Sequence, residues 1–202
     1  FPSKFAGVLP QPPMDVEVIE TESGLAWLLA PGNVQEPAPV VFLFHGNGEN
    51  IANRLPDARA YQARGLAVAQ VEYPGYGGTP GSPSEAYDTI TARPDVDSGR
   101  VLVHGFSIGG GVAGQLADKR TVHGLILEST FSSVVAIYRS MRIPGFLCRD
   151  PFRTDRVLEG YRGELLLIHG HRDEIVPIEH SRRLHAGVSA SAEPQRSGDG
   201  PG

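Results

Sequence analysis

The pentapeptide Gly105-Phe106-Ser107-Ile108-Gly109 lies between a predicted strand and a predicted helix. The run Arg100 to His104 before it is mostly apolar, which is typical of a parallel strand buried on both faces. The segment Ile108 to Lys119 after it indicates a helix. Glycines beside Ser107 permit a sharp turn, because a side chain there would collide with the strand or the helix. The sequence therefore predicts a serine hydroxyl raised above the end of a sheet.

The predicted helix after this turn is unusually rich in glycine, at positions 109, 110, 111 and 114. Each interior glycine costs a helix about 1 kcal/mol relative to alanine. Such locally unfavourable choices are expected where function or very close packing overrides propensity. The alternative is an ordinary strand-to-helix turn that carries a surface serine.

Apolar runs and helical segments alternate along the rest of the chain. This alternation predicts an α/β fold, with a mostly parallel sheet, helices on both faces and an antiparallel hairpin at the N-terminal end. The hairpin is expected at 15–20 and 25–30, further strands at 39–44, 66–71, 124–127 and 164–168, and further helices at 50–64 and 178–185.

Composition fits one globular domain over residues 1–202, with 40% hydrophobic and 20% charged residues. The net charge of −5, without a long basic run, argues against a nucleic-acid partner. No apolar run approaches the roughly 18 residues that cross a bilayer. Cys148 is the only cysteine, so an internal disulfide is impossible and a cytoplasmic location is expected. An anchor or signal ahead of Phe1 is the alternative.

Three segments of this domain are expected to differ from the sheet and helices. Residues 1–13, with four prolines, predict an irregular leader. Residues 132–160 lie between two strands and are interpreted as a cap-like insertion over the site. Residues 186–202 are rich in Ser, Gly and Pro, which is typical of a disordered tail.

Polar motifs follow each of the predicted parallel strands. They include His45-Gly46-Asn47-Gly48, Glu72-Tyr73-Pro74-Gly75-Tyr76, Glu128-Ser129-Thr130-Phe131 and His169-Gly170-His171-Arg172-Asp173. Ligands of such sheets bind beyond the carboxyl ends of the strands. We therefore expect these motifs and Ser107 to form one site.

With these motifs the chain resembles the α/β-hydrolase family, in its serine esterase and acyl-hydrolase branch, from about Val16 to His185. The resemblance implies that Ser107 is the nucleophile and that backbone N–H groups of Asn47 and Ile108 form the oxyanion hole. It implies that Asp173, just before Val176-Pro177, is the acid that orients a histidine. It also implies that no cofactor is needed.

The same motifs contain two other candidate acids and one pair of histidines that could be considered as metal ligands. Glu174 follows Asp173 directly, and Glu128 occupies another strand end, where it is interpreted as a structural residue. His169 and His171 form an H-x-H pair, but no cluster at metal-ligand spacing accompanies it, so no metal is expected.

The histidine of the family pattern projects to roughly 30 residues beyond the acid, at about position 203. The sequence ends at Gly202, so the chain is either truncated there or catalytically incomplete. His180 and His185, on the helix after the acid, are the nearest substitutes.

The leading hypothesis is a serine hydrolase that cleaves carboxylic ester or thioester bonds of a small molecule through an acyl-enzyme on Ser107. One alternative is a binding protein on the same fold that lacks the triad histidine. A serine peptidase is another, because it would share the serine turn and the acid. Acyl length and oligomeric state stay open.

Overall fold

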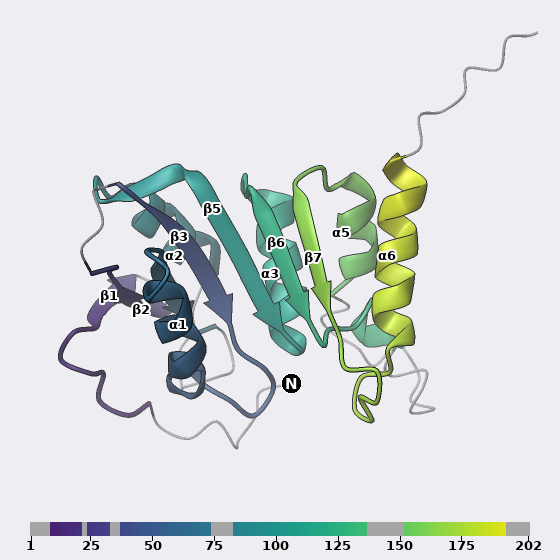
Figure 1. The fold of residues 1–202 in the computed structure, drawn as a ribbon, viewed down its shortest axis with the longest axis horizontal. Coiled ribbons are helices and arrows are strands. Elements are labelled where there is room, and N and C mark those ends of the chain that lie inside the picture. Colours follow the sequence, from purple (N-terminus) through teal and green to yellow (C-terminus); the bar gives the residue numbers. More distant parts are fainter. Residues whose placement is uncertain (1–8, 22–23, 33–36, 74–82, 137–151, 193–202) are drawn as a thin grey trace, which may run out of the picture.

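The computed structural model describes residues 9–21, 24–32, 37–73, 83–136 and 152–192. In this part of the chain, strands form a sheet in the order β1-β2-β4-β3-β5-β6-β7 (Figure 1). The strands are β1 (Glu17–Thr21), β2 (Gly24–Leu29), β3 (Ala38–Phe44), β4 (Ala67–Val71), β5 (Val96–Phe106), β6 (Gly124–Glu128) and β7 (Glu164–Ile168).

The sheet is antiparallel at one side and parallel elsewhere. β1 pairs antiparallel with β2, and β2 with β4, whereas the pairs β3–β4, β3–β5, β5–β6 and β6–β7 are parallel. This topology confirms the predicted fold class. It also brings the carboxyl ends of β3, β4, β5, β6 and β7 to one edge of the sheet, which we call the rim.

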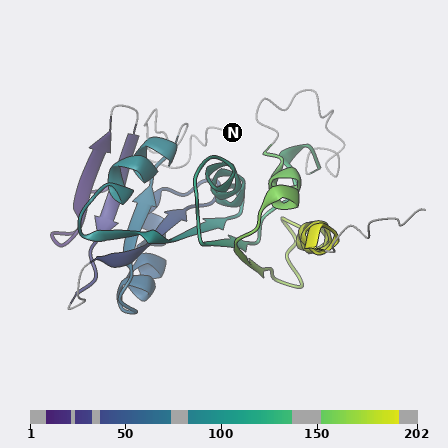
Figure 2. The same ribbon diagram turned by 90° about the horizontal axis from the view of Figure 1, so that it is seen from above.

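Helices cover both faces of the sheet (Figure 2). The 3-10 helix η1 (Ile51–Arg54) and α1 (Leu55–Gln62) contribute Ile51 and Ala58 to a core cluster around Trp27. On the other face, α2 (Pro83–Thr91), α3 (Ile108–Lys119) and α5 (Thr154–Gly160) bury side chains in a larger core around Phe42 and Val103. The last helix, α6 (Glu179–Ala192), packs along α5.

The helix expected at 50–64 is divided into η1 and α1. Asn50 begins η1 with a capping box, in which its side chain accepts from Ala52 N–H and Asn53 accepts from the Asn50 N–H. The segment ends at Gly65, whose φ of 84° is left-handed. Glycine adopts that conformation at little cost, which explains why the helix stops there.

Two helices differ from the expectations: α6 is longer than predicted, and α5 lies where a cap-like insertion was predicted. α6 continues through seven residues of the predicted tail to Ala192, since its alanines favour helix and the first proline is Pro194. α5 lies within the predicted cap-like insertion, yet it packs against α3 and α6. The end of that insertion therefore belongs to the helical layer of the fold.

Several expectations fall on residues outside the described part. They concern residues 1–8 of the leader, the Tyr-Pro-Gly-Tyr-Gly loop within 74–82, residues 137–151 of the insertion with Cys148, and 193–202 of the tail. Among the helices that are described, none combines the length and apolarity needed to span a bilayer.

Candidate active site

Ser107 occupies a strained turn between β5 and α3. Its φ of 53° and ψ of −118° lie outside the regions that most L-residues adopt. The turn brings the start of α3 so close to β5 that a Cβ on Gly105 would overlap the Gly109 carbonyl. Strained residues of this kind persist where the surrounding structure fixes them, and they are common at functional sites.

Both backbone polar groups of Ser107 are fixed by hydrogen bonds. The Ser107 N–H donates to the Glu128 carbonyl at 2.9 Å, across the ends of β5 and β6. The Ser107 carbonyl accepts the Thr130 hydroxyl at 2.7 Å and the Gly110 N–H at 3.0 Å. The last residue of β6 and the turn after it therefore hold both backbone groups of Ser107.

The loop after β3, residues 45–48, lies against the start of α3. A Cβ on Gly109 would overlap the carbonyl oxygens of Phe44 and His45, and a Cβ on Gly46 would come within 2.8 Å of the Phe106 ring. Ile108 is therefore a close neighbour of this loop. Asn47, in the same loop, has an exposed side chain.

A buried histidine–carboxylate pair supports that loop. His45 Nε2 donates to Glu72 Oε1 at 2.8 Å, and the two side chains are 1% and 0% exposed. The other Glu72 oxygen accepts the Ile51 N–H at 3.1 Å, and the Tyr73 hydroxyl donates to the His45 carbonyl at 2.7 Å. His45 is thus a structural residue that joins the ends of β3 and β4.

Asp173 lies in the loop after β7, two strands from Ser107 in the sheet order. One of its oxygens accepts the N–H groups of Ile175 and Val176, both at 2.9 Å. Burial acts to raise the pKa of Asp173, but these hydrogen bonds and nearby His169 outweigh it and hold the pKa below its usual range. Asp173 is therefore an ionised carboxylate at neutral pH.

His169 fixes the loop that carries Asp173. Its Nε2–H donates to the Val176 carbonyl, and Nδ1 accepts the Ser181 hydroxyl, each at 2.6 Å. This tautomer follows because a carbonyl oxygen can only accept. Nε2 also lies 3.6 Å from Asp173 Oδ2. With both nitrogens engaged and only 3% of the side chain exposed, His169 is a structural neighbour of the acid.

His180 contacts a different part of the rim. Its Nδ1 accepts the N–H and the hydroxyl of Ser132, at 3.2 and 3.1 Å. Burial, together with Arg183 and His169, lowers the pKa of His180, so the ring is neutral at pH 7. His185, the other substitute considered for the base, has an exposed side chain farther along α6.

Glu128 belongs to a separate chain of hydrogen bonds. The Tyr61 hydroxyl donates to His104 Nδ1, and His104 Nε2–H donates to Glu128 Oε2, each at 3.1 Å. The His104 hydrogen bond, with a smaller contribution from Arg54, lowers the pKa of Glu128 against the effect of burial. This carboxylate connects β6, β5 and α1.

The rim thus gathers four predicted site residues: Ser107, Ile108, Asn47 and Asp173. The Ser107 N–H is hydrogen-bonded to the Glu128 carbonyl, and the next residue, Ser129, donates its N–H to the Ile168 carbonyl at 2.8 Å. The serine turn is therefore joined through the end of β6 to the end of β7, where the loop that carries Asp173 begins.

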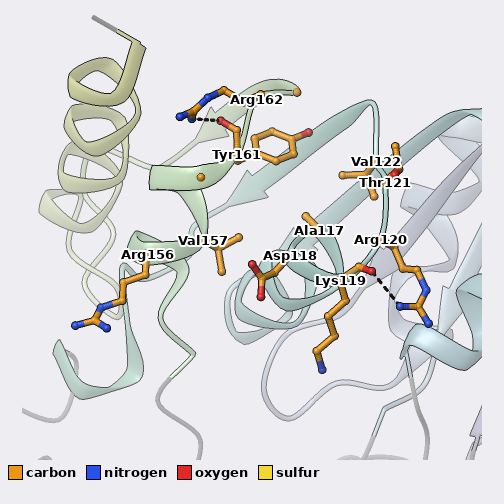
Figure 3. Close-up of a pocket in the computed structure, with 12 residues that line it drawn as sticks. Ala117, Asp118, Lys119, Arg120, Thr121, Val122, Arg156, Val157, Tyr161 and Arg162 are labelled. Carbon is orange, nitrogen blue, oxygen red and sulfur yellow. Dashed lines mark hydrogen bonds between the residues drawn. The ribbon is translucent and has the colours of Figure 1, made fainter. Parts of the chain in front are cut away.

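A pocket of about 470 Å³ lies at the opposite end of the sheet from the rim. It is formed by the C-terminal turns of α3 and α5 and the segments that follow them. Lys119, Arg120 and Arg156 border it, but their side chains point in different directions rather than toward one point (Figure 3). The pocket contains none of the predicted site residues.

Sequence reasoning missed the supporting roles of Glu72, Thr130 and His169. Glu72 could have been paired with His45, because parallel β3 and β4 align Leu43 with Gln70, and both residues lie two positions farther on. The contacts of Thr130 and His169 depend on the shapes of the turns after β6 and β7, which the hydrophobic periodicity of the sequence does not reveal.

Comparisons with known proteins agree with this fold. The model of the alpha/beta hydrolase family matches residues 40–197. An uncharacterized protein of Mycobacterium tuberculosis is 32% identical over 195 residues, covering 89% of this chain and 68% of the relative. Protein bem46 of Schizosaccharomyces pombe is 34% identical over 170 residues, covering 75% of this chain and 57% of the relative.

Among solved structures, the acylaminoacyl peptidase of Pyrococcus horikoshii superposes with a TM-score of 0.73 at 14% identity. The match covers 88% of this chain and 35% of the peptidase, so the chain spans about a third of that protein and somewhat over half of bem46. At this identity the likeness shows the fold alone. From the family match and the topology together, the chain belongs to the alpha/beta hydrolase family.

Proposed function

We propose that this protein is a serine hydrolase that cleaves carboxylic ester or thioester bonds of small molecules through an acyl-enzyme on Ser107. The observation that carries the proposal is the strained conformation of Ser107 at the start of α3, directly beside the loop 45–48. A nucleophilic serine on a strand-to-helix turn requires this arrangement, because its oxygen must stand clear of the sheet and face N–H donors.

In the proposed reaction, the Ser107 oxygen attacks the acyl carbon and loses its proton to a general base. The negative oxygen of the tetrahedral intermediate is stabilised by the backbone N–H groups of Ile108 and Asn47. When the intermediate collapses, the alcohol or thiol leaves with the proton from the base. Water then attacks the acyl-enzyme by the same route, releasing the carboxylic acid and restoring the Ser107 hydroxyl.

Two features support the assignment of the oxyanion hole. The contact of Gly109 with the carbonyls of Phe44 and His45 keeps Ile108 close to the loop that contains Asn47. The buried His45–Glu72 pair fixes that loop, so its N–H groups need not reorganise during the reaction. Donors held in advance are worth about 10²–10³-fold in rate each at comparable sites.

Asp173 is assigned as the acid that orients the base and stabilises its charged form. Its ionised state and its fixed position in the loop after β7, the strand beside β6, support this role. In the family pattern the base is a histidine roughly 30 residues after the acid. We do not assign the role to His169 or His180, because the ring nitrogens described above are engaged elsewhere.

The test is hydrolysis by the purified full-length protein of p-nitrophenyl esters and acyl thioesters of increasing chain length, with a matched amide. We expect turnover of at least one ester or thioester, and loss of that turnover in Ser107→Ala. Ser98→Ala is the matched control, since it makes the same change at the other, exposed end of β5.

Three results would contradict the proposal. Turnover that survives in Ser107→Ala would exclude Ser107 as the nucleophile. Faster cleavage of the amide than of the ester would favour a peptidase. Saturable binding of the substrates with no turnover would favour a binding protein on the same fold.

A further inference from the structure

The geometry points to Thr130 as a positioning residue that orients and polarises one donor of the oxyanion hole. The inference rests on the proposed function, in which the Ile108 N–H stabilises the tetrahedral intermediate. Thr130 would not touch the substrate. Its hydroxyl would act through the peptide group that joins Ser107 to Ile108.

The peptide group between Ser107 and Ile108 connects Thr130 to the proposed oxyanion hole. The Ser107 carbonyl and the Ile108 N–H belong to one planar, rigid unit. The Thr130 hydroxyl donates to that carbonyl at 2.7 Å, and the side chain is fully buried, so water does not compete for the bond. Fixing the carbonyl end of the plane therefore fixes the direction in which the N–H points.

The turn after β6 places Thr130 beside this peptide group at the start of α3. β6 ends at Glu128, and Ser129 has a left-handed φ of 45°, which turns the chain at once. Ser129 donates its N–H to Ile168 on the neighbouring strand at 2.8 Å, which holds this unfavourable turn. Thr130 then lies so close to α3 that a Cβ on Gly110 would overlap its hydroxyl.

The Thr130 hydrogen bond also changes the electron distribution of the Ser107–Ile108 peptide group. The backbone carbonyl of Glu128 accepts the Ser107 N–H at 2.9 Å, while the Thr130 hydroxyl donates to the Ser107 carbonyl. Residues 128–130 therefore hold both backbone polar groups of the strained residue. A hydrogen bond donated to a carbonyl draws electron density toward its oxygen and strengthens the N–H of the same peptide group as a donor. The hydroxyl of Thr130 thus prepares the Ile108 N–H for a negative oxygen.

The test compares Thr130→Val, which removes the hydroxyl at similar volume, with Thr130→Ser, which keeps it. With the best substrate of the panel, we expect Thr130→Val to lower kcat about tenfold and to leave KM within about twofold, since the bond acts on the transition state. Thr130→Ser should stay within about threefold of the wild-type kcat. If Thr130→Val does not fold, Thr130→Ala is compared with Thr130→Ser instead.

Thr91→Val is the matched control, because Thr91 also donates its hydroxyl to a carbonyl, that of Tyr87 at 2.8 Å, but within α2. It should leave kcat unchanged. A kcat loss in Thr130→Val no larger than in Thr91→Val would overturn the inference, and so would an effect confined to KM or an equal loss in Thr130→Ser.

A second measurement separates this inference from the proposed function. In the free protein, we expect the Ile108 amide proton resonance to move upfield in Thr130→Val and to stay near its wild-type position in Thr130→Ser, whether or not the protein hydrolyses esters. An unchanged Ile108 resonance in Thr130→Val would overturn the polarising role even in an active enzyme. A wild-type protein without turnover that still shows the expected shift would overturn the proposed function, and with it the oxyanion-hole role, but not the polarisation of the Ile108 N–H by Thr130.

Discussion

Two of the histidine–carboxylate pairs at the rim, His45–Glu72 and His169–Asp173, differ in how much of the carboxylate faces solvent. Glu72, paired with His45 at 2.8 Å, is completely buried and also accepts the Ile51 N–H. Asp173, 3.6 Å from His169, keeps 17% of its side chain exposed. Glu72 is enclosed by its partners and stabilises the fold, whereas the partly exposed Asp173 can still contact another group, as the proposed triad requires. This difference in burial agrees with a structural role for Glu72 and with the proposed role of Asp173.

The largest effect expected from this comparison is on turnover. Asp173→Asn keeps an oxygen that accepts the N–H groups of Ile175 and Val176, so the loop should hold. Without the negative charge, we expect kcat to fall about 10⁴-fold, as for acids of other serine triads. Steady-state kinetics with the best ester measures it.

Glu174→Gln is the control for that change, since Glu174 is the neighbouring exposed carboxylate. It should alter kcat less than twofold on the scale of ordinary surface changes. Equal losses in the two variants would mean that Asp173 has no special role.

The next effect should be on stability. Glu72→Ala leaves His45 and the Ile51 N–H buried without their acceptor, which should cost about 3–5 kcal/mol in the free energy of unfolding. Urea denaturation followed by circular dichroism measures it. Glu72→Gln, which can still accept one of these bonds, should cost clearly less, and a loss below about 1 kcal/mol in Glu72→Ala would remove the proposed difference between the pairs.

An intermediate result is expected for His169→Ala. The Val176 carbonyl and the Ser181 hydroxyl would both lose their 2.6 Å partner, at a cost of about 1–3 kcal/mol in unfolding free energy. Because Asp173 stays in place through its backbone hydrogen bonds, kcat should fall far less than in Asp173→Asn. A kcat loss as large as that of Asp173→Asn would show that His169 itself takes part in the chemistry.

The smallest effect concerns pH. Because the pKa of Asp173 is lower in the folded protein than in the unfolded chain, its carboxylate stabilises the fold above the unfolded value of about 3.9. That contribution should be lost as pH falls through the folded pKa. The wild type should exceed Asp173→Asn in unfolding free energy by less than about 1 kcal/mol at pH 6, and by nothing at pH 2. A difference in unfolding free energy that grows as the pH falls would mean that folding raises the pKa of Asp173 and would contradict this prediction.

Much of the fold could be predicted because most of its parallel strands are continuous apolar runs. The glycines of the serine turn also indicated that the strand and the helix approach each other closely. Gly105 and Gly109 are required by contacts with backbone atoms, which no side chain could relieve. The positions of Ser107 and Asp173 at strand ends followed from the same pattern.

The rest depends on contacts between segments far apart in the sequence. The hydrogen bond from Thr130 to Ser107 requires the left-handed Ser129, and a serine gives no signal of that conformation. The end of α6 at Ala192 was misjudged because serine and glycine in its last turns outweighed the alanines in a reading by composition. The packing of α6 on α5 supplies the stabilisation that local propensity lacks.

The most direct measurement of the central claim is the site of covalent labelling. The full-length protein is treated with a fluorophosphonate, digested, and analysed by mass spectrometry, beside Ser107→Ala and Ser98→Ala. We expect one phosphonylated peptide, modified at Ser107, which is absent in Ser107→Ala and retained in Ser98→Ala. A folded wild-type protein that stays unlabelled, or that is labelled at another residue, would contradict it.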